Sequence, residues 1–131
     1  MSADRPGRAP KARNTPVRAL LTGWFSFLHG EATAGDVLAA QAVAAALDRA
    51  GIPYRMAWSP AFRPEALHLD DADPAAFTHV VFVCGPLHSD APAGGDPAPL
   101  LALHRRFARC RRIAVGTSVL DPEDPTVTGF H

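Results

Sequence analysis

Three glycine-containing stretches hold most of the residues that could bind or transform a ligand, and each follows a run of apolar residues. They span residues 23–36, 85–96 and 116–121. Glycine lets backbone amides approach a ligand closely, and histidine can exchange a proton near neutral pH. We therefore expect a substrate-binding surface here, while no residue is assigned a catalytic role. The candidate substrate-binding residues are Gly23, Trp24, His29, Gly35, Asp36, Gly85, Pro86, His88, Gly116 and Thr117.

The first stretch leads into a predicted helix, and the free amides at the start of a helix attract anions. Gly23, Gly30 and Gly35 do not have the GxGxxG spacing of a dinucleotide-binding loop, and the sequence contains no GKS or GKT. Asp36 at the helix start would repel a phosphate. Its carboxylate is interpreted either as a helix cap or as an acid that orients a sugar hydroxyl or a loop amide.

Other reactive side chains give weaker indications. Cys84 and His88 have the types of a nucleophile and its base, but Cys84 ends an apolar run, where free cysteines are commonly core residues. Trp24 could stack on a sugar ring or pack beneath the helix that follows it. No two histidines have the spacing of zinc ligands on one helix face, so we expect no metal site.

Five arginines crowd residues 105–112, at the end of a predicted helix and the start of a strand. Cations at this position complement the helix dipole and keep the surface soluble, and the alternative is that they bind phosphate or RNA. The formal net charge of the chain is zero, with 13 basic and 13 acidic residues, which argues against a nucleic-acid partner. The five arginines are Arg105, Arg106, Arg109, Arg111 and Arg112.

The elements that must position these residues alternate between strand and helix. Apolar runs predict strands over residues 17–22, 52–59, 79–84 and 113–120, the last including the start of its loop. Apolar residues at helical spacing predict helices over residues 37–51 and 100–109. The alternation predicts an α/β fold: a three-layer Rossmann-like sandwich with a mostly parallel sheet of about four strands. Ligands bind such sheets at the carboxyl ends of the strands, where the three stretches begin.

The ends of the chain differ from its middle. Residues 1–16 are basic and proline-rich and predict a disordered tail, and residues 17–131 form one α/β domain. Residues 121–131 read as a loop without a closing helix, which would leave one face of the sheet partly bare. We therefore expect the domain to be incomplete at its C-terminus and the chain to be the N-terminal part of a longer protein.

Composition bears on where the chain works. Its 2 cysteines have no CxxC or metal-ligand spacing, which favours reduced thiols in the cytoplasm. No apolar run reaches the roughly 20 residues that a membrane span requires.

The segments RALLTGWFSF (residues 18–27) and AGDVLA (residues 34–39) resemble the N-terminus of the polysaccharide pyruvyl transferase family. The resemblance implies the N-terminal half of a two-domain glycosyltransferase-B-like fold. It implies transfer of a pyruvyl group from phosphoenolpyruvate to a sugar hydroxyl as a ketal, with no cofactor beyond that donor. The implied partners are a sugar or polysaccharide acceptor and a missing C-terminal domain or second subunit.

The family's histidine and arginine that handle the donor belong to its C-terminal half, so nothing here corresponds to them and this chain alone is expected to be inactive. Residues 28–33 make the first loop longer than the family's compact pattern. Two other functions stay open. One is a stand-alone flavodoxin-like or regulator-like domain that binds a small ligand, and the other is an interaction module that pairs through an exposed sheet face.

Overall fold

The computed structural model describes residues 16–27, 34–87, 98–119 and 121–130 of the 131-residue chain. The strands are β1 (Ala19–Thr22), β2 (Tyr54–Met56), β3 (His79–Leu87) and β4 (Arg111–Val119). The helices are α1 (Ala34–Arg49), α2 (Ala98–Arg106) and the short α3 (Pro125–Thr128), with 3₁₀ turns η2 (Trp24–Ser26), η3 (Leu69–Asp71) and η4 (Pro74–Ala76).

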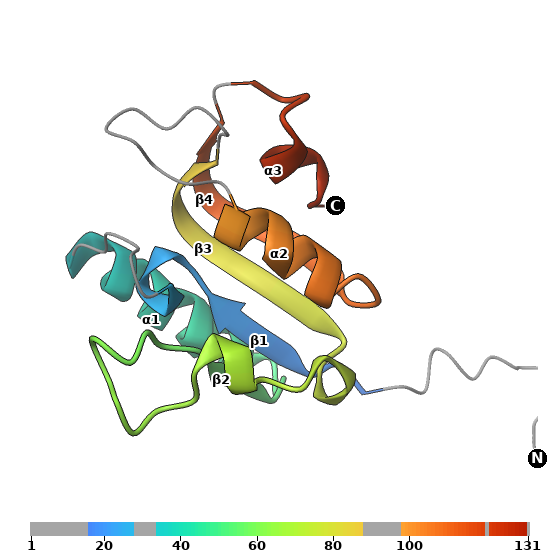
Figure 1. Cartoon of the computed structure of the whole chain (residues 1–131). Helices are drawn as coiled ribbons and strands as arrows, with labels where there is room; N and C mark the ends of the chain where they lie inside the picture. Colours follow the sequence, from blue (N-terminus) through green and yellow to red (C-terminus); the bar gives the residue numbers. More distant parts are fainter. Residues whose placement is uncertain (1–15, 28–33, 88–97, 120, 131) are drawn as a thin grey trace, which may run out of the picture.

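The four strands form one parallel sheet in the order β2-β1-β3-β4. The chain moves from β1 outward to β2 and then returns past β1 to β3, so the direction of winding reverses between β1 and β3. Helix α1 covers one face of the sheet, whereas α2 and α3 lie on the other (Figure 1). The predicted α/β sandwich with a parallel four-stranded sheet is therefore confirmed.

Two apolar clusters hold the layers together because successive strand residues point to opposite faces. Leu21 and Val81 pack against Ala40 and Ala44 of α1. On the other face, Leu20, Val80 and Phe82 pack against residues of α2 and of the connection before β3. The central strands β1 and β3 are buried on both faces, as their continuous apolar runs predict. Small alanines on α1 let that helix approach the sheet closely.

The helix predictions are confirmed within a few residues, and Gly51 has the left-handed φ of 70° that suits the residue after a helix. The second strand is shorter than predicted. Pro53 precedes it, and the backbone amides of Trp58 and Ser59 donate hydrogen bonds to loop carbonyls instead of to a neighbouring strand. The predicted tail, residues 1–15, lies outside the described residues, as do His29 and His88.

The ends of the third and fourth strands require a correction. Gly85, Pro86, Gly116 and Thr117 were expected in loops after the strands, but they lie inside β3 and β4. Gly85 pairs with Thr117 and Pro86 with Ser118. Pairing continues because Cys84 (φ 71°) and Gly116 (φ 66°) both adopt left-handed backbone at matching positions, so that the two strands bend together.

The C-terminal stretch is also not the plain loop that the sequence predicts. Asp124 caps α3, since its Oδ1 accepts hydrogen bonds from the Thr126 amide and hydroxyl, and Pro125 occupies the first helical position. Val127 and Phe130 then pack against the apolar cluster on the α2 face. Part of the face that was expected to be bare is thus covered.

Within the described ranges, every helix is too short or too polar to cross a lipid bilayer.

Candidate functional site

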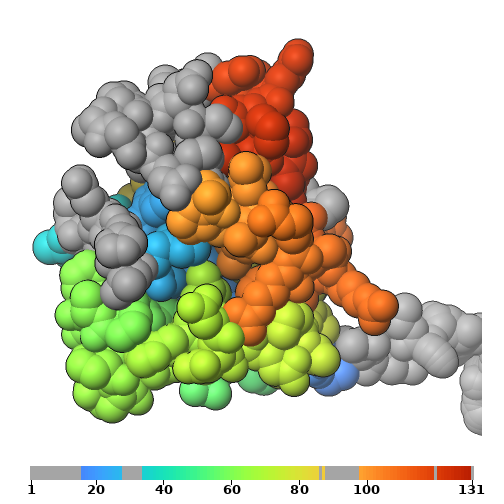
Figure 2. All heavy atoms as spheres, viewed as in Figure 1, coloured from blue at the N-terminus to red at the C-terminus, as the bar shows by residue number. Residues whose placement is uncertain are grey.

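The carboxyl edge of β1 and β3 brings together several of the predicted site residues. Gly23 follows β1 so closely against β3 that an added Cβ would lie 2.8 Å from the Val83 carbonyl oxygen. Gly35 and Asp36 form the first turn of α1. Figure 2 shows the segment after β1, in blue, reaching the surface between the green loop that follows β2 and the orange α2. The winding reversal and the start of α1 therefore meet at one place, where α/β sheets commonly bind ligands.

Ser26 fixes the turn that follows β1. Its hydroxyl donates to the Ala57 carbonyl at 2.6 Å and accepts from the Gly23 amide at 3.3 Å. The Ser59 amide also donates to the Phe25 carbonyl at 2.8 Å. The loops after β1 and β2 are thereby joined into one rim of the carboxyl edge. No motif marks this role of Ser26, because both of its hydrogen-bond partners are backbone groups.

Cys84 is the residue whose position differs most from expectation. Its left-handed backbone is uncommon for any residue but glycine, and it turns the half-buried thiol towards the α1 face. There the thiol is hydrogen-bonded to the Asp36 side chain. Asp36 therefore contacts the end of β3 as well as opening α1, an arrangement that neither interpretation of the sequence included.

The same contact decides how reactive Cys84 is. The hydrogen bond with Asp36, burial and the negative charge of Asp36 raise the pKa of the Cys84 thiol, while a backbone hydrogen bond at Gly85 opposes the increase. A thiol with a raised pKa is protonated at neutral pH and is a poor nucleophile. The geometry thus favours a structural or ligand-binding role for Cys84 over nucleophilic catalysis.

Trp24 packs inside the molecule, but on the α2 face of the sheet and not, as expected from the sequence, beneath α1, the helix that follows it. Its ring lies 5.4 Å from Phe27 and 5.5 Å from Phe82, the latter in an edge-on arrangement. An added Cβ on Gly85 would overlap Trp24 Cδ1 and lie 2.8 Å from Nε1. Gly85 is therefore required for the close approach of the Trp24 side chain. From the sequence we expected a ligand to make this approach.

Gly116 and Thr117 lie one strand further out. Thr117 is beside Gly85 in the register, so it shares the carboxyl end of the sheet. A Cβ on Gly116 would meet no atom within 4 Å. The left-handed φ of this position therefore accounts for the preference for glycine, and crowding by neighbouring atoms does not. Gly116 lies opposite Cys84, between the paired positions Val83–Val115 and Gly85–Thr117, so both residues border the candidate site on the β4 side.

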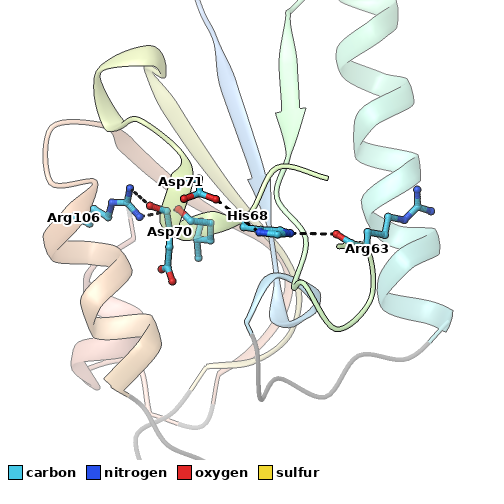
Figure 3. A network of polar contacts seen from close by, with 6 residues as sticks. Arg63, His68, Asp70, Asp71 and Arg106 are labelled. Carbon is cyan, nitrogen blue, oxygen red and sulfur yellow. Dashed lines mark hydrogen bonds and ion pairs between the residues drawn. The ribbon is translucent and has the colours of Figure 1, made fainter. Parts of the chain in front are cut away.

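Arg106 and Arg112 bind backbone carbonyls, a role that the sequence did not indicate. Arg106 donates to the carbonyls of Leu69, Asp70 and Ala72 at 2.6–2.8 Å. Figure 3 shows its guanidinium reaching from α2 to the connection before β3. Arg112 donates to the carbonyls of Phe107, Cys110 and Gly129 at 2.8–3.0 Å. Both cations stabilise the fold.

His68 belongs to the same connection. Its Nε2 lies 3.3 Å from the Arg63 carbonyl and its Nδ1 lies 3.8 Å from an Asp71 carboxylate oxygen (Figure 3). Arg63 in turn lies over the Trp58 ring at 4.4 Å. These contacts shape the connection before β3, so we assign His68 a structural role.

The described residues support binding better than catalysis. No three histidine, cysteine or acidic side chains gather among them in a way that could hold a metal ion. The edge offers close backbone approach at Gly23, the acid Asp36 and the first turn of α1. Comparison of the chain with protein-family models, curated proteins and solved structures finds no match, so the geometry carries the argument for function.

Proposed function

We propose that this chain is the N-terminal half of a polysaccharide pyruvyl transferase-like enzyme, and that the carboxyl edge of β1 and β3 forms one wall of its substrate cleft. The observation that supports the proposal is the meeting of Gly23, Asp36 and Cys84 where the winding of the sheet reverses. The resemblance of residues 18–27 and 34–39 to that family covers the strand, the turn and the helix start that build this edge.

The proposed reaction forms a ketal from phosphoenolpyruvate and two hydroxyls of one sugar. One hydroxyl oxygen adds to C2 of the enolpyruvyl group, and C3 gains a proton to become a methyl group. The second hydroxyl oxygen then displaces phosphate from C2, and its proton leaves with the phosphate. Negative charge on the departing phosphate requires fixed cations, which the other half of the enzyme would supply.

In this proposal Asp36 binds the acceptor rather than the donor. Its carboxylate lies at the start of α1, where it repels phosphate but can accept a hydrogen bond from a sugar hydroxyl. A carboxylate acceptor makes a strong hydrogen bond with a hydroxyl. The acceptor sugar would then lie against the edge of β1 and β3, with phosphoenolpyruvate on the opposite side of the cleft.

Calorimetric titration of the chain with methyl β-D-galactopyranoside and with phosphoenolpyruvate tests this assignment. We expect Asp36→Asn to weaken pyranoside binding about tenfold, the value of one charge-assisted hydrogen bond. The matched control is Asp48→Asn, which changes an exposed acid in the last part of the same helix and should leave binding unchanged. Equal pyranoside affinity of Asp36→Asn and the unaltered chain would remove the basis for the acceptor site.

The activity of the chain is a separate measurement. Mixed with phosphoenolpyruvate and a pyranoside, the 131-residue chain should release no phosphate, because the proposal assigns the donor-binding cations to another domain or subunit. Phosphate release coupled to ketal formation by the chain alone would show that this division of labour is wrong.

A second candidate function is a stand-alone domain that binds a small ligand in the manner of flavodoxins. The observation in its favour is the strand order β2-β1-β3-β4, which matches the first four strands of the flavodoxin-like order, where flavin binds at the β1/β3 reversal. The chain lacks a phosphate loop rich in Ser and Thr after β1. Thermal unfolding with and without FMN separates the two functions: a raised Tm supports the flavodoxin-like one, and an unchanged Tm excludes it.

A further inference from the structure

Thr22, the last residue of β1, carries a buried hydroxyl that has no hydrogen-bond partner in the described part of the chain. Its exposed fraction is 0%. A buried hydroxyl left unpaired lowers stability, so its retention needs an explanation. Thr22 lies beside Phe82 in the register of β1 and β3, and Phe82 belongs to the cluster on the α2 face. The hydroxyl therefore lies on that face, at the carboxyl end of the sheet.

Phe82 is the centre of an aromatic group on the same face. The ring centroids of Trp24, Phe27 and Phe130 lie 5.5, 6.4 and 5.9 Å from that of Phe82. Trp24 and Phe27 belong to the turn directly after β1, next to Thr22. Phe130 comes from the far end of the chain. The unpaired hydroxyl thus lies at the side of an aromatic cluster, one ring of which is contributed by the segment after α3.

Residues 125–130, which we call the cover segment, contact α2, β4 and the apolar cluster on the α2 face. His104 of α2 contacts three of its residues: Nε2 lies 3.0 Å from the Thr126 carbonyl oxygen, the ring meets Phe130 edge-on at 4.6 Å, and a Cβ on Gly129 would overlap the imidazole. Arg112 of β4 donates to the Gly129 carbonyl at 3.0 Å. The helix in the segment has only 4 residues, too short to be stable without these contacts.

We propose that the cover segment is hinged and closes a binding subsite on the α2 face, and that this subsite takes a planar heteroaromatic ring in the place of the Phe130 side chain. A flat ring of that size can pack against Phe82 and His104 as Phe130 does. An acceptor atom on the ring can receive the hydrogen bond that the Thr22 hydroxyl lacks, which a phenyl ring cannot provide. The subsite goes beyond the proposed transfer reaction, because neither phosphoenolpyruvate nor a pyranose is a planar aromatic ring.

The test uses nicotinamide, a single planar ring with a carbonyl acceptor, and NMR titration of the full chain. Phe130→Ala removes the competing ring and should bind nicotinamide at least about tenfold more tightly than the unaltered chain. In the Phe130→Ala background, Thr22→Val replaces the hydroxyl with a methyl group of similar shape. This double variant should bind nicotinamide about tenfold more weakly than Phe130→Ala alone, which corresponds to the loss of one hydrogen bond. Adding Thr22→Ser in its place keeps the hydroxyl and should keep the affinity.

A measurement on the unaltered chain covers the case in which Phe130→Ala does not fold. The amides of Val127, Thr128 and Phe130 are bonded within the cover segment and its cap. Saturating nicotinamide should accelerate their hydrogen exchange and leave that of Leu20 and Val81 in the central strands unchanged. Unchanged exchange of the cover segment, no gain with Phe130→Ala, or equal affinity of the Thr22→Val and Thr22→Ser forms would each overturn the proposal. None of these readouts uses a sugar or phosphoenolpyruvate, so they can fail or succeed independently of the transfer reaction.

Discussion

Gly85 and Gly51 both have left-handed backbone, with φ of 91° and 70°, but only Gly85 is crowded by another residue. Gly51→Ala should cost about 1 kcal/mol, because a Cβ in this backbone region is unfavourable and meets no other atom. Gly85→Ala should cost about 3 kcal/mol, since the added Cβ also overlaps the Trp24 ring. Urea unfolding of both variants measures the difference, and equal losses would mean that Trp24 does not hold its place above Gly85.

Asp36 should control the reactivity of Cys84. Because Asp36 raises the pKa of the Cys84 thiol, Asp36→Asn should increase the rate at which a disulfide reagent modifies Cys84 at pH 8. The experiment is done in a Cys110→Ala background, so that Cys84 is the only thiol in the chain. Asp48→Asn is the control and should leave the rate unchanged. If Asp36→Asn left the rate of Cys84 modification unchanged or lowered it, the contact between the two side chains would be contradicted.

Gly23, Asp36 and Gly85 are recognisable as site candidates from the sequence, but the partner expected for Gly85, a ligand, is not the one that it contacts. A glycine at the end of an apolar run indicates close approach or unusual backbone, and both are present. What approaches is Trp24, which is distant in sequence, so the pattern alone cannot distinguish a side chain from a ligand. Cys84 stood out only as a weak nucleophile candidate beside His88. Its left-handed backbone opposite Gly116 had no sequence signal, because cysteine seldom adopts that conformation.

The connection between β2 and β3 depends on Arg106 at the level of elements. It contains only short 3₁₀ turns, and their carbonyls are bound by the guanidinium of α2 through three hydrogen bonds. Arg106→Lys keeps the charge but loses the planar set of donors, so it should cost about 2 kcal/mol in free energy of unfolding. Arg105→Lys, an exposed neighbour in the same helix, should change stability by less than about 0.5 kcal/mol. Similar losses in the two variants would assign the effect to helix propensity.

Helices were easier to predict than strand ends. The alanine-rich pattern that stops at Gly51 locates α1 well, because helix signals are local. The ends of β3 and β4 depend on pairing between strands more than 30 residues apart, as with Gly85 and Thr117. From sequence alone, Gly85-Pro86 predicts the end of a strand. Only the bend at Cys84 and Gly116 shows why β3 continues past this pair. Helix α3 was missed for a different reason: its Asp-Pro start is a valid helix signal, but 4 residues are too few to show a period.

The stability of the whole molecule should fall in alkali through its thiols. Burial raises the pKa of Cys110, and the Asp36 hydrogen bond together with burial raises that of Cys84, both above the ordinary 9.0. Below pH 9 the folded and unfolded chains both keep these protons, so the thiols cause no pH dependence. Above it the unfolded chain releases them first, and the free energy of unfolding declines as pH rises through the raised values.

Urea unfolding between pH 7 and 10.5 measures this decline. The Cys84→Ala/Cys110→Ala form should show a shallower alkaline decline than the unaltered chain, whatever its stability at pH 7. Parallel declines in the two forms would show that the thiols are not held in their protonated state by the fold.

The bend shared by Cys84 and Gly116 also affects how the chain meets its own copies. Strand β4 forms the margin of the described sheet, is 9 residues long and exposes Val115 and Val119, which are features of strands that recruit others and aggregate. The left-handed turn of Gly116 divides this margin into two short lengths that point in different directions, so a stray strand can align with only one of them. We therefore expect the glycine that shapes the carboxyl edge also to disfavour continuous pairing of β4 with a strand of another copy.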